Sequence, residues 1–125
     1  MRINTPFSPI EVGETDYFVF DFTPDVGAAT IASTNWSCAL GAYETVVDPT
    51  PQSRILSAFP QTAIQLRSPM DGSLQMRTGA FSVGYIGGMP ASAAGGTYIL
   101  EATANLSDGR VLKLNATVQC KLPGS

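Results

Sequence analysis

The chain has 125 residues, which fit a single domain with one hydrophobic core. Hydrophobic residues make up 44% of it and charged residues 14%, a balance that favours a folded domain over a disordered chain. Ten acidic and seven basic side chains give a net charge of -3 without clusters of Lys and Arg, which argues against nucleic acid as a partner. No segment approaches the roughly 18 apolar residues of a membrane span, and the first residues lack the apolar stretch of a signal peptide. We therefore expect no membrane partner and a chain that is made and folded in a cytoplasm.

The first residues predict an extended N-terminal arm over residues 1–13, followed by one domain over residues 14–125. Pro6 and Pro9 flank apolar positions and disfavour regular secondary structure there. Two interpretations of this segment remain open: a frayed terminus, or a segment that docks on a neighbouring protein. Under the second interpretation its interface candidates are Ile3, Phe7 and Ile10. In both cases we expect the domain to fold without this N-terminal segment.

Alternation with a period of two predicts strands along most of the remaining chain. In "DYFVFDF", residues 16–22, three phenylalanines including Phe20 share one face, which indicates a half-buried strand. In "TIASTNWSCAL", residues 30–40, the apolar phase includes Trp36 and Cys38, and we expect Trp36 at the centre of the core. Two further strand candidates are "RILSAF", residues 54–59, and "AFSVGYI", residues 80–86.

Two segments are poor in strand signals. Residues 41–53, "GAYETVVDPTPQS", contain two prolines and are predicted to form a long loop. Residues 87–96, "GGMPASAAGG", are predicted to be a linker between strands. Long loops in compact domains are functional or mobile, so Tyr43 is a further interface candidate.

The stretch "AIQLRSPMDGSLQMR", residues 63–77, predicts a β-hairpin whose apolar residues all fall on even positions. A three-residue loop that ends with Asp71 and Gly72, with the glycine in a left-handed conformation, keeps those residues on one face. This register pairs Leu66 with Met76.

The stretch "TYILEATANLSDGRVLKLNATVQC", residues 97–120, predicts a second hairpin of the same kind. A two-residue turn of Asp108 and Gly109 is excluded, because it would send the apolar set of one strand to the wrong face. A three-residue loop that ends with Gly109 avoids this conflict and sets small residues opposite large ones. The predicted pairs include Ala104 with Leu112 and Ala102 with Leu114.

Six to eight short strands with turn signals between them predict an all-β fold, an antiparallel β-sandwich. No window shows the spacing of an amphipathic helix, so we expect essentially no helix. Arg67 and Arg77 are either rim residues of an interface or solubilising groups at strand ends. The predicted core residues are Phe20, Trp36, Cys38, Tyr98, Leu112 and Leu114.

The sequence shows no grouping of residues that is typical of a catalytic site. It contains no histidine, and its carboxylates are scattered, so acid–base catalysis lacks a matched pair of groups and we expect no enzyme. Without a Cys-x-x-Cys pair or histidine, no zinc site and no cofactor are predicted. Cys38 and Cys120 lie on apolar strand phases and are interpreted as buried thiols, with a disulfide between them as the alternative.

Several short motifs follow one another in a specific order along the chain. They begin with "DYFVFDF" and "TIASTNW", continue with "GG" and "TY", and end with "SDGR". This ordered set resembles a family of small tailed-bacteriophage proteins, the fibre-tail adaptors. Residues 41–79 have no counterpart in that family's pattern, and "FSVGYIGG" departs from it. The matching positions are Asp16, Tyr17, Asp21, Phe22, Thr30, Ile31, Ala32, Ser33, Trp36, Gly87, Gly88, Thr97, Tyr98, Ser107, Asp108, Gly109 and Arg110.

The resemblance implies an immunoglobulin-like β-sandwich that acts as a virion structural protein and attaches tail fibres to the tail or head-to-tail connector. The implied partners are other tail, connector or fibre proteins, with several copies around a ring, and the implied location is the virion. The alternative is a carbohydrate- or ligand-binding sandwich module, which would need exposed aromatic residues clustered on one face. Its candidates Tyr43, Phe59 and Tyr85 are scattered along the sequence, which argues against it.

Overall fold

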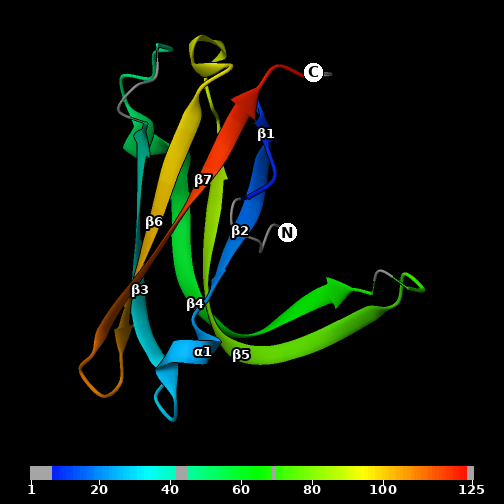
Figure 1. Cartoon of the computed structure of the whole chain (residues 1–125), viewed down its shortest axis with the longest axis vertical. Helices are drawn as coiled ribbons and strands as arrows, with labels where there is room; N and C mark the ends of the chain where they lie inside the picture. Colours follow the sequence, from blue (N-terminus) through cyan, green and yellow to red (C-terminus); the bar gives the residue numbers. More distant parts are fainter. Residues whose placement is uncertain (1–6, 42–44, 69, 124–125) are drawn as a thin grey trace.

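The computed structural model describes residues 7–41, 45–68 and 70–123 of the chain. Seven strands in these residues form two sheets that pack face to face, which confirms the all-β sandwich (Figure 1). One sheet has the order β1-β7-β6-β3 and the other β2-β5-β4. Neighbouring strands are antiparallel, except that β1 is parallel to β7. The strands are β1 (Ile10–Glu11), β2 (Thr15–Asp21), β3 (Ile31–Leu40), β4 (Ile55–Arg67), β5 (Leu74–Gly87), β6 (Thr97–Leu106) and β7 (Val111–Lys121).

Helical structure is limited to single turns in the described residues. They are the helix α1 (Thr23–Val26) and the 3-10 turns η1 (Pro51–Arg54) and η2 (Ala91–Ala93). In the same residues no helix has the length and apolar character needed to cross a bilayer.

Trp36 lies in the core between the two sheets, as predicted. Its ring packs against Phe20 with 5.0 Å between ring centres, and its indole N–H donates a hydrogen bond of 2.7 Å to Ser82 Oγ. A Cβ atom added at Gly84 would lie 2.6 Å from the Trp36 ring, so the indole is accommodated only because this position has no side chain. Cys38 and Tyr98 are also buried, while Leu112 and Leu114 are half-buried against the same core.

The β6–β7 hairpin has the predicted register. Ala104 lies opposite Leu112 and Ala102 lies opposite Leu114. The Leu106 N–H donates to the Arg110 carbonyl over 2.9 Å, and Gly109 has a φ of +90°, as a three-residue loop that ends in a left-handed glycine requires.

The β4–β5 hairpin differs from its prediction in register and in length. Leu66 lies opposite Gln75 rather than Met76, because the Ser68 N–H donates to the Ser73 carbonyl and closes a four-residue loop. Segments predicted as separate strands merge into β4 and β5, which have 13 and 14 residues. Pro60 is tolerated within β4 because this strand is at the edge of its sheet.

The N-terminal segment contributes to the core from Phe7 onward. Ile10 is fully buried in β1, which pairs with β7. The Phe7 ring packs edge-on against Phe18 and Phe20, with centre distances of 5.0 and 5.1 Å. The prediction of Phe7 and Ile10 as interface residues is therefore wrong, and the domain begins before the predicted boundary at residue 13. The third candidate of this segment, Ile3, lies outside the described residues.

The predicted long loop is held against the domain over its second half. The Gln52 side chain accepts a hydrogen bond from the Cys38 N–H and donates one to the Trp36 carbonyl, over 3.1 and 3.0 Å. The Val47 N–H donates to the Ser92 carbonyl over 3.1 Å. Residues 45–54 are thus held by polar contacts to β3 and to the segment that contains Ser92, whereas Tyr43 lies outside the described residues.

Candidate functional site

The outer half of the β4–β5 hairpin, residues 63–78, projects away from the sandwich, and we call it the arm (Figure 1). The third strand of this sheet, β2, pairs with β5 only between Phe81 and Gly87, so the arm is a two-stranded ribbon. The pairing of β4 with β5 shifts between Gln61 and Ala63, where the arm begins. Irregularities of this kind bend strands and increase their twist, which explains why the arm leaves the plane of the sheet.

One side of the arm packs back against the outer face of its own sheet. Ile64 is buried there in a small cluster with Val19, Phe81 and Val83. Arg77, the register partner of Ile64, lies 2.6 Å from an oxygen of Asp21 on β2. The direction of the arm is therefore fixed by both apolar and ionic contacts.

The opposite side of the arm carries exposed apolar side chains. Leu74 and Met76 are 56% and 64% exposed, and alternation along β5 sets them on the side opposite Arg77. Met70, in the loop at the tip, is 94% exposed. Apolar side chains gathered on one projecting element are a common feature of protein interaction sites.

Residues 71–73 at the tip of the arm are held by local hydrogen bonds. Asp71 Oδ1 accepts hydrogen bonds from the Ser73 N–H and hydroxyl over 2.9 and 2.7 Å, and these bonds lower the pKa of Asp71. Gly72 has a φ of +73°, and its carbonyl accepts a hydrogen bond of 2.7 Å from Arg67. The predicted interface candidates Arg67 and Arg77 thus both lie on the arm, one at its tip and the other at its base.

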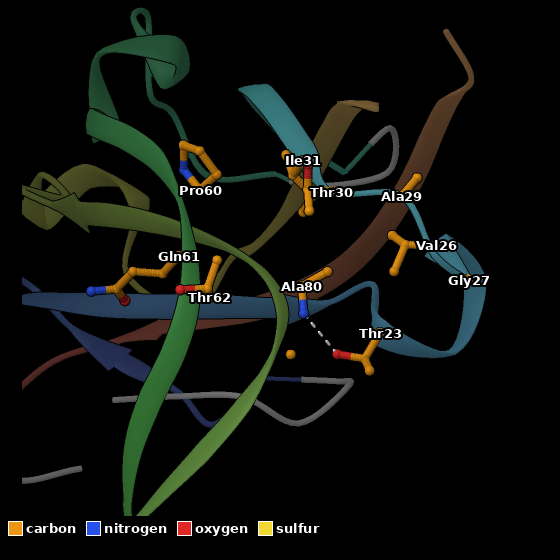
Figure 2. Close-up of a pocket in the computed structure, with 11 residues that line it drawn as sticks. Thr23, Val26, Gly27, Ala29, Thr30, Ile31, Pro60, Gln61, Thr62 and Ala80 are labelled. Carbon is orange, nitrogen blue, oxygen red and sulfur yellow. Dashed lines mark hydrogen bonds between the residues drawn. The ribbon is translucent and has the colours of Figure 1, made fainter. Parts of the chain in front are cut away.

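A pocket of about 270 Å³ lies at the foot of the arm, between α1, the start of β3, and the bend of β4 and β5 (Figure 2). Its wall is mostly apolar, with threonine hydroxyls among the lining groups. The Ala80 N–H donates a hydrogen bond of 3.0 Å to Thr23 Oγ1, which ties α1 to the bend (Figure 2). The apolar lining residues include Val26, Ala29, Ile31, Pro60 and Ala80.

Three aromatic residues gather on the outer face of the β2-β5-β4 sheet. Tyr17 and Tyr85 are stacked with 4.7 Å between ring centres, and Phe59 meets Tyr17 edge-on at 6.4 Å. Tyr17, Phe59, Gln61 and Val83 line a shallow pocket of about 220 Å³. Phe59 and Tyr85 are scattered along the sequence, but strand pairing brings them to the same face, so their spacing is no argument against a binding face.

A polar cluster beneath the segment of residues 45–54 includes the buried carboxylate of Asp48. The Tyr98 hydroxyl donates a hydrogen bond of 2.5 Å to Asp48 Oδ2, and Arg54 Nε lies 3.5 Å from the same oxygen. Arg54 also donates a hydrogen bond to the Gly88 carbonyl. Burial, with the hydrogen bond to Asp48, raises the pKa of Tyr98 well above its usual value. These contacts hold the loop to the sandwich, and the cluster serves the fold.

Both cysteines are buried free thiols. Burial, with the nearby charge of Asp48, raises the pKa of Cys38 to about 12, and burial also raises the pKa of Cys120. A thiol with so high a pKa is a poor nucleophile at neutral pH, because the thiolate is the reactive form. Among the described residues no group of three or more His, Cys, Asp or Glu side chains is arranged to hold a metal ion.

Comparisons of the chain with protein-family models, curated proteins and solved structures find no match. The geometry of the arm, of the pocket at its foot and of the aromatic face is therefore the basis for assigning a function. Pairing between distant strands creates each of these features. Only the alternation within β4 and β5 gives a signal for them in the sequence, and it does not distinguish a core face from an exposed one.

Proposed function

We propose that the chain is an immunoglobulin-like structural protein of a tailed-bacteriophage virion, which attaches tail fibres to the tail or head-to-tail connector. In this proposal it is made and folded in the host cytoplasm and then joins the particle, in several copies around a ring. The ordered motifs that resemble fibre-tail adaptors support it. So does an architecture made of a rigid sandwich and a projecting arm, because mechanical attachment needs a stiff body and an exposed contact element.

The strand order supports the immunoglobulin-like part of the proposal. Immunoglobulin sandwiches place their second, fifth and fourth strands in one sheet and their third, sixth and seventh in the other, with a buried tryptophan on the third. Here β2, β5 and β4 form one sheet, while β3, β6 and β7 lie in the other, and Trp36 lies on β3. The antibody disulfide is absent, and Phe20 packs against Trp36 instead.

Two residues from the family-like motifs make contacts at the base of the arm or beside the pocket at its foot. Asp21, from "DYFVFDF", makes the ion pair with Arg77 of the arm. Arg110, from "SDGR", donates hydrogen bonds of 3.0 and 2.7 Å to the carbonyls of Asp25 and Val26. The second contact holds the end of α1, which forms one wall of the pocket. These motif positions thus support the structure from which the arm projects.

The arm is the observation that carries the assembly part of the proposal. It exposes Met70, Leu74 and Met76, which would be costly in a protein that acts alone but suits a component that is covered on assembly. The test is to find the chain in purified phage particles by mass spectrometry and to place it by cryo-electron microscopy. We expect density for the sandwich between the fibre bases and the tail. Particles that carry fibres but lack the chain would refute the proposal.

The aromatic face favours a second candidate function, a carbohydrate-binding module. Sugar rings stack on exposed aromatic rings, and an amide such as that of Gln61 can hydrogen-bond to sugar hydroxyls. A glycan array with wild-type protein and the variant Tyr17→Ala tests it. This candidate predicts binding that the variant loses, and it fails if wild-type protein binds no glycan on the array.

A further inference from the structure

We propose that the arm of one copy of this chain inserts Met70 into the pocket at the foot of the arm of a second copy. The two surfaces lie on different parts of the chain, so each copy offers one of each. The inference takes its biological setting from the proposed function. It concerns the purified chain alone, however, so either can fail without the other.

Met70 is suited to be the inserted group. It is 94% exposed at the tip of an element whose other side and loop are fixed by hydrogen bonds and an ion pair. A rigid element loses little conformational entropy when it binds. The methionine side chain is flexible and apolar, and it adapts to irregular apolar cavities. Leu74 and Met76 on the same ribbon extend the apolar surface behind it.

Met70 cannot fill the pocket of its own chain. From Thr62, which lines the pocket, strand β4 continues to Arg67, a rise of roughly 16 Å at about 3.3 Å per residue. The tip therefore lies well away from the pocket, as the projecting arm in Figure 1 illustrates. Only the arm of another molecule can reach it.

The pocket has the size and chemistry to receive such a side chain. Its volume is about 270 Å³, whereas an apolar cavity of about 150 Å³ already admits benzene. Val26, Ala29 and Ile31 supply apolar wall on one side, and Pro60 and Ala80 supply it on the other (Figure 2). Burying the methionine there would remove apolar surface of both partners from water.

Charge also favours contact between one copy's arm and another copy's body. Residues 63–78 contain Arg67, Arg77 and Asp71, so the arm has a net charge of +1. Because the whole chain has a net charge of -3, the rest of the chain has a net charge of -4. Arg67 lies beside the tip, and the exposed Asp25 lies in α1, next to the pocket residue Val26. Complementary charges of this kind steer association and disfavour the opposite orientation.

The symmetry of the assembly follows from the geometry. A contact between two different surfaces is head-to-tail, and it forms a closed ring or an open filament depending on the rotation between copies. A single inserted side chain gives a weak contact, and closure of a ring strengthens it because every copy is held twice. The purified chain should therefore form larger species as its concentration rises.

Two complementary variants test the contact by sedimentation equilibrium at high protein concentration, which detects weak association without diluting the sample. Met70→Glu removes the inserted group, and Ala29→Phe fills the pocket. We expect each variant alone to be a monomer, with the circular dichroism of the wild type. A mixture of the two should form dimers and nothing larger, because one intact tip and one intact pocket remain. Oligomers of either variant alone, or a mixture that stays monomeric, would overturn the proposal.

Disulfide trapping in the full chain tests the same contact at the level of residues. Met70→Cys protein mixed with Thr30→Cys protein, whose new thiol lies in the pocket wall, should give covalent dimers under mild oxidation. The matched control is Met70→Cys mixed with Ile99→Cys, which has a thiol on the exposed surface of β6. We expect at least ten-fold more dimer in the first mixture. Equal yields in the two mixtures would overturn the proposal.

Discussion

Asp21 and Arg77, which are 56 residues apart in the sequence, are joined by a contact of 2.6 Å between Oδ2 and Nη2. Asp21 belongs to the sandwich and Arg77 to the arm, so this ion pair helps to set the direction of the arm. The Arg77 guanidinium also lies 5.8 Å from the centre of the Phe81 ring, a cation–π distance. The arm is thus a fixed extension of the sheet.

Replacing Arg77 with Gln should loosen the arm and leave the sandwich intact. The guanidinium is about half exposed, and such ion pairs contribute about 0–1 kcal/mol, so we expect a loss of less than about 1 kcal/mol in the free energy of unfolding. Hydrogen exchange of residues 63–67 and 74–78 should become faster. The control Arg67→Gln affects only the tip. Unchanged exchange at the base of the arm in Arg77→Gln would contradict this role of the ion pair.

Replacing Gly109 with Val should destabilise the β6–β7 hairpin. A φ of +90° is strained for any residue with a β-branched side chain, and we expect a loss of about 1–3 kcal/mol in urea denaturation. Thr117→Val, at an exposed position of β7, is the matched control and should change stability by less than about 0.5 kcal/mol. If the two variants are equally stable, the loop does not require its glycine.

Removing the side chain of Phe7 or of Ile10 should destabilise the whole domain. Both are buried in the core, and truncation to Ala costs about 3–5 kcal/mol for a buried Phe and about 2–5 kcal/mol for a buried Ile. The exposed Val111→Ala serves as the control. If Phe7→Ala and Ile10→Ala unfold at the same temperature as the wild type, the N-terminal segment is dispensable for stability and the prediction is wrong.

The Tyr98 phenol should make the stability depend on alkaline pH. Its pKa is raised by burial and by Asp48, so the folded chain keeps the proton at pH values where the unfolded chain loses it. The free energy of unfolding should therefore fall above about pH 10, by about 1.4 kcal/mol per pH unit for this group. Cys38 and Cys120 contribute a further fall in the same direction, from about pH 9.

The variant Tyr98→Phe isolates the contribution of the phenol. It should be less stable than wild type at pH 8, because the Asp48 carboxylate loses a hydrogen bond. Above pH 10 the difference between the two proteins should shrink, since only wild type loses the phenol proton on unfolding. A difference in urea denaturation that stays constant between pH 8 and pH 11 would contradict the assignment.

The sequence predicted the β6–β7 hairpin correctly because several signals agree there. Both strands alternate without interruption, and only a loop ending in Gly109 keeps Leu112 and Leu114 on the same face as Ala102 and Ala104. In the arm the same reasoning gave the wrong register. It assumed that all apolar residues face a core, whereas Leu74 and Met76 lie on an exposed side of a ribbon.

Features that depend on distant segments gave little signal in the sequence. Phe7 and Ile10 look the same whether they pack on their own domain or on a neighbour, so the pattern could not decide between the two. The segment of residues 45–54, which includes η1, is held by side-chain hydrogen bonds of Gln52 and Asp48, and such contacts leave no periodic pattern in the sequence. The pocket and the aromatic face each combine residues from several elements and depend on the strand order.

An arm-shortened variant tests most directly whether fibre attachment requires the arm. Ala63 and Thr78 are register partners, so residues 64–77 can be replaced with Asn-Gly, which favours a tight turn. Near-ultraviolet circular dichroism of Trp36 should report a folded sandwich, with lower stability because Ile64 is lost from its cluster. We predict that particles assembled with this variant, viewed by electron microscopy, lack tail fibres. Particles that contain the folded variant and carry their full set of fibres would contradict the account.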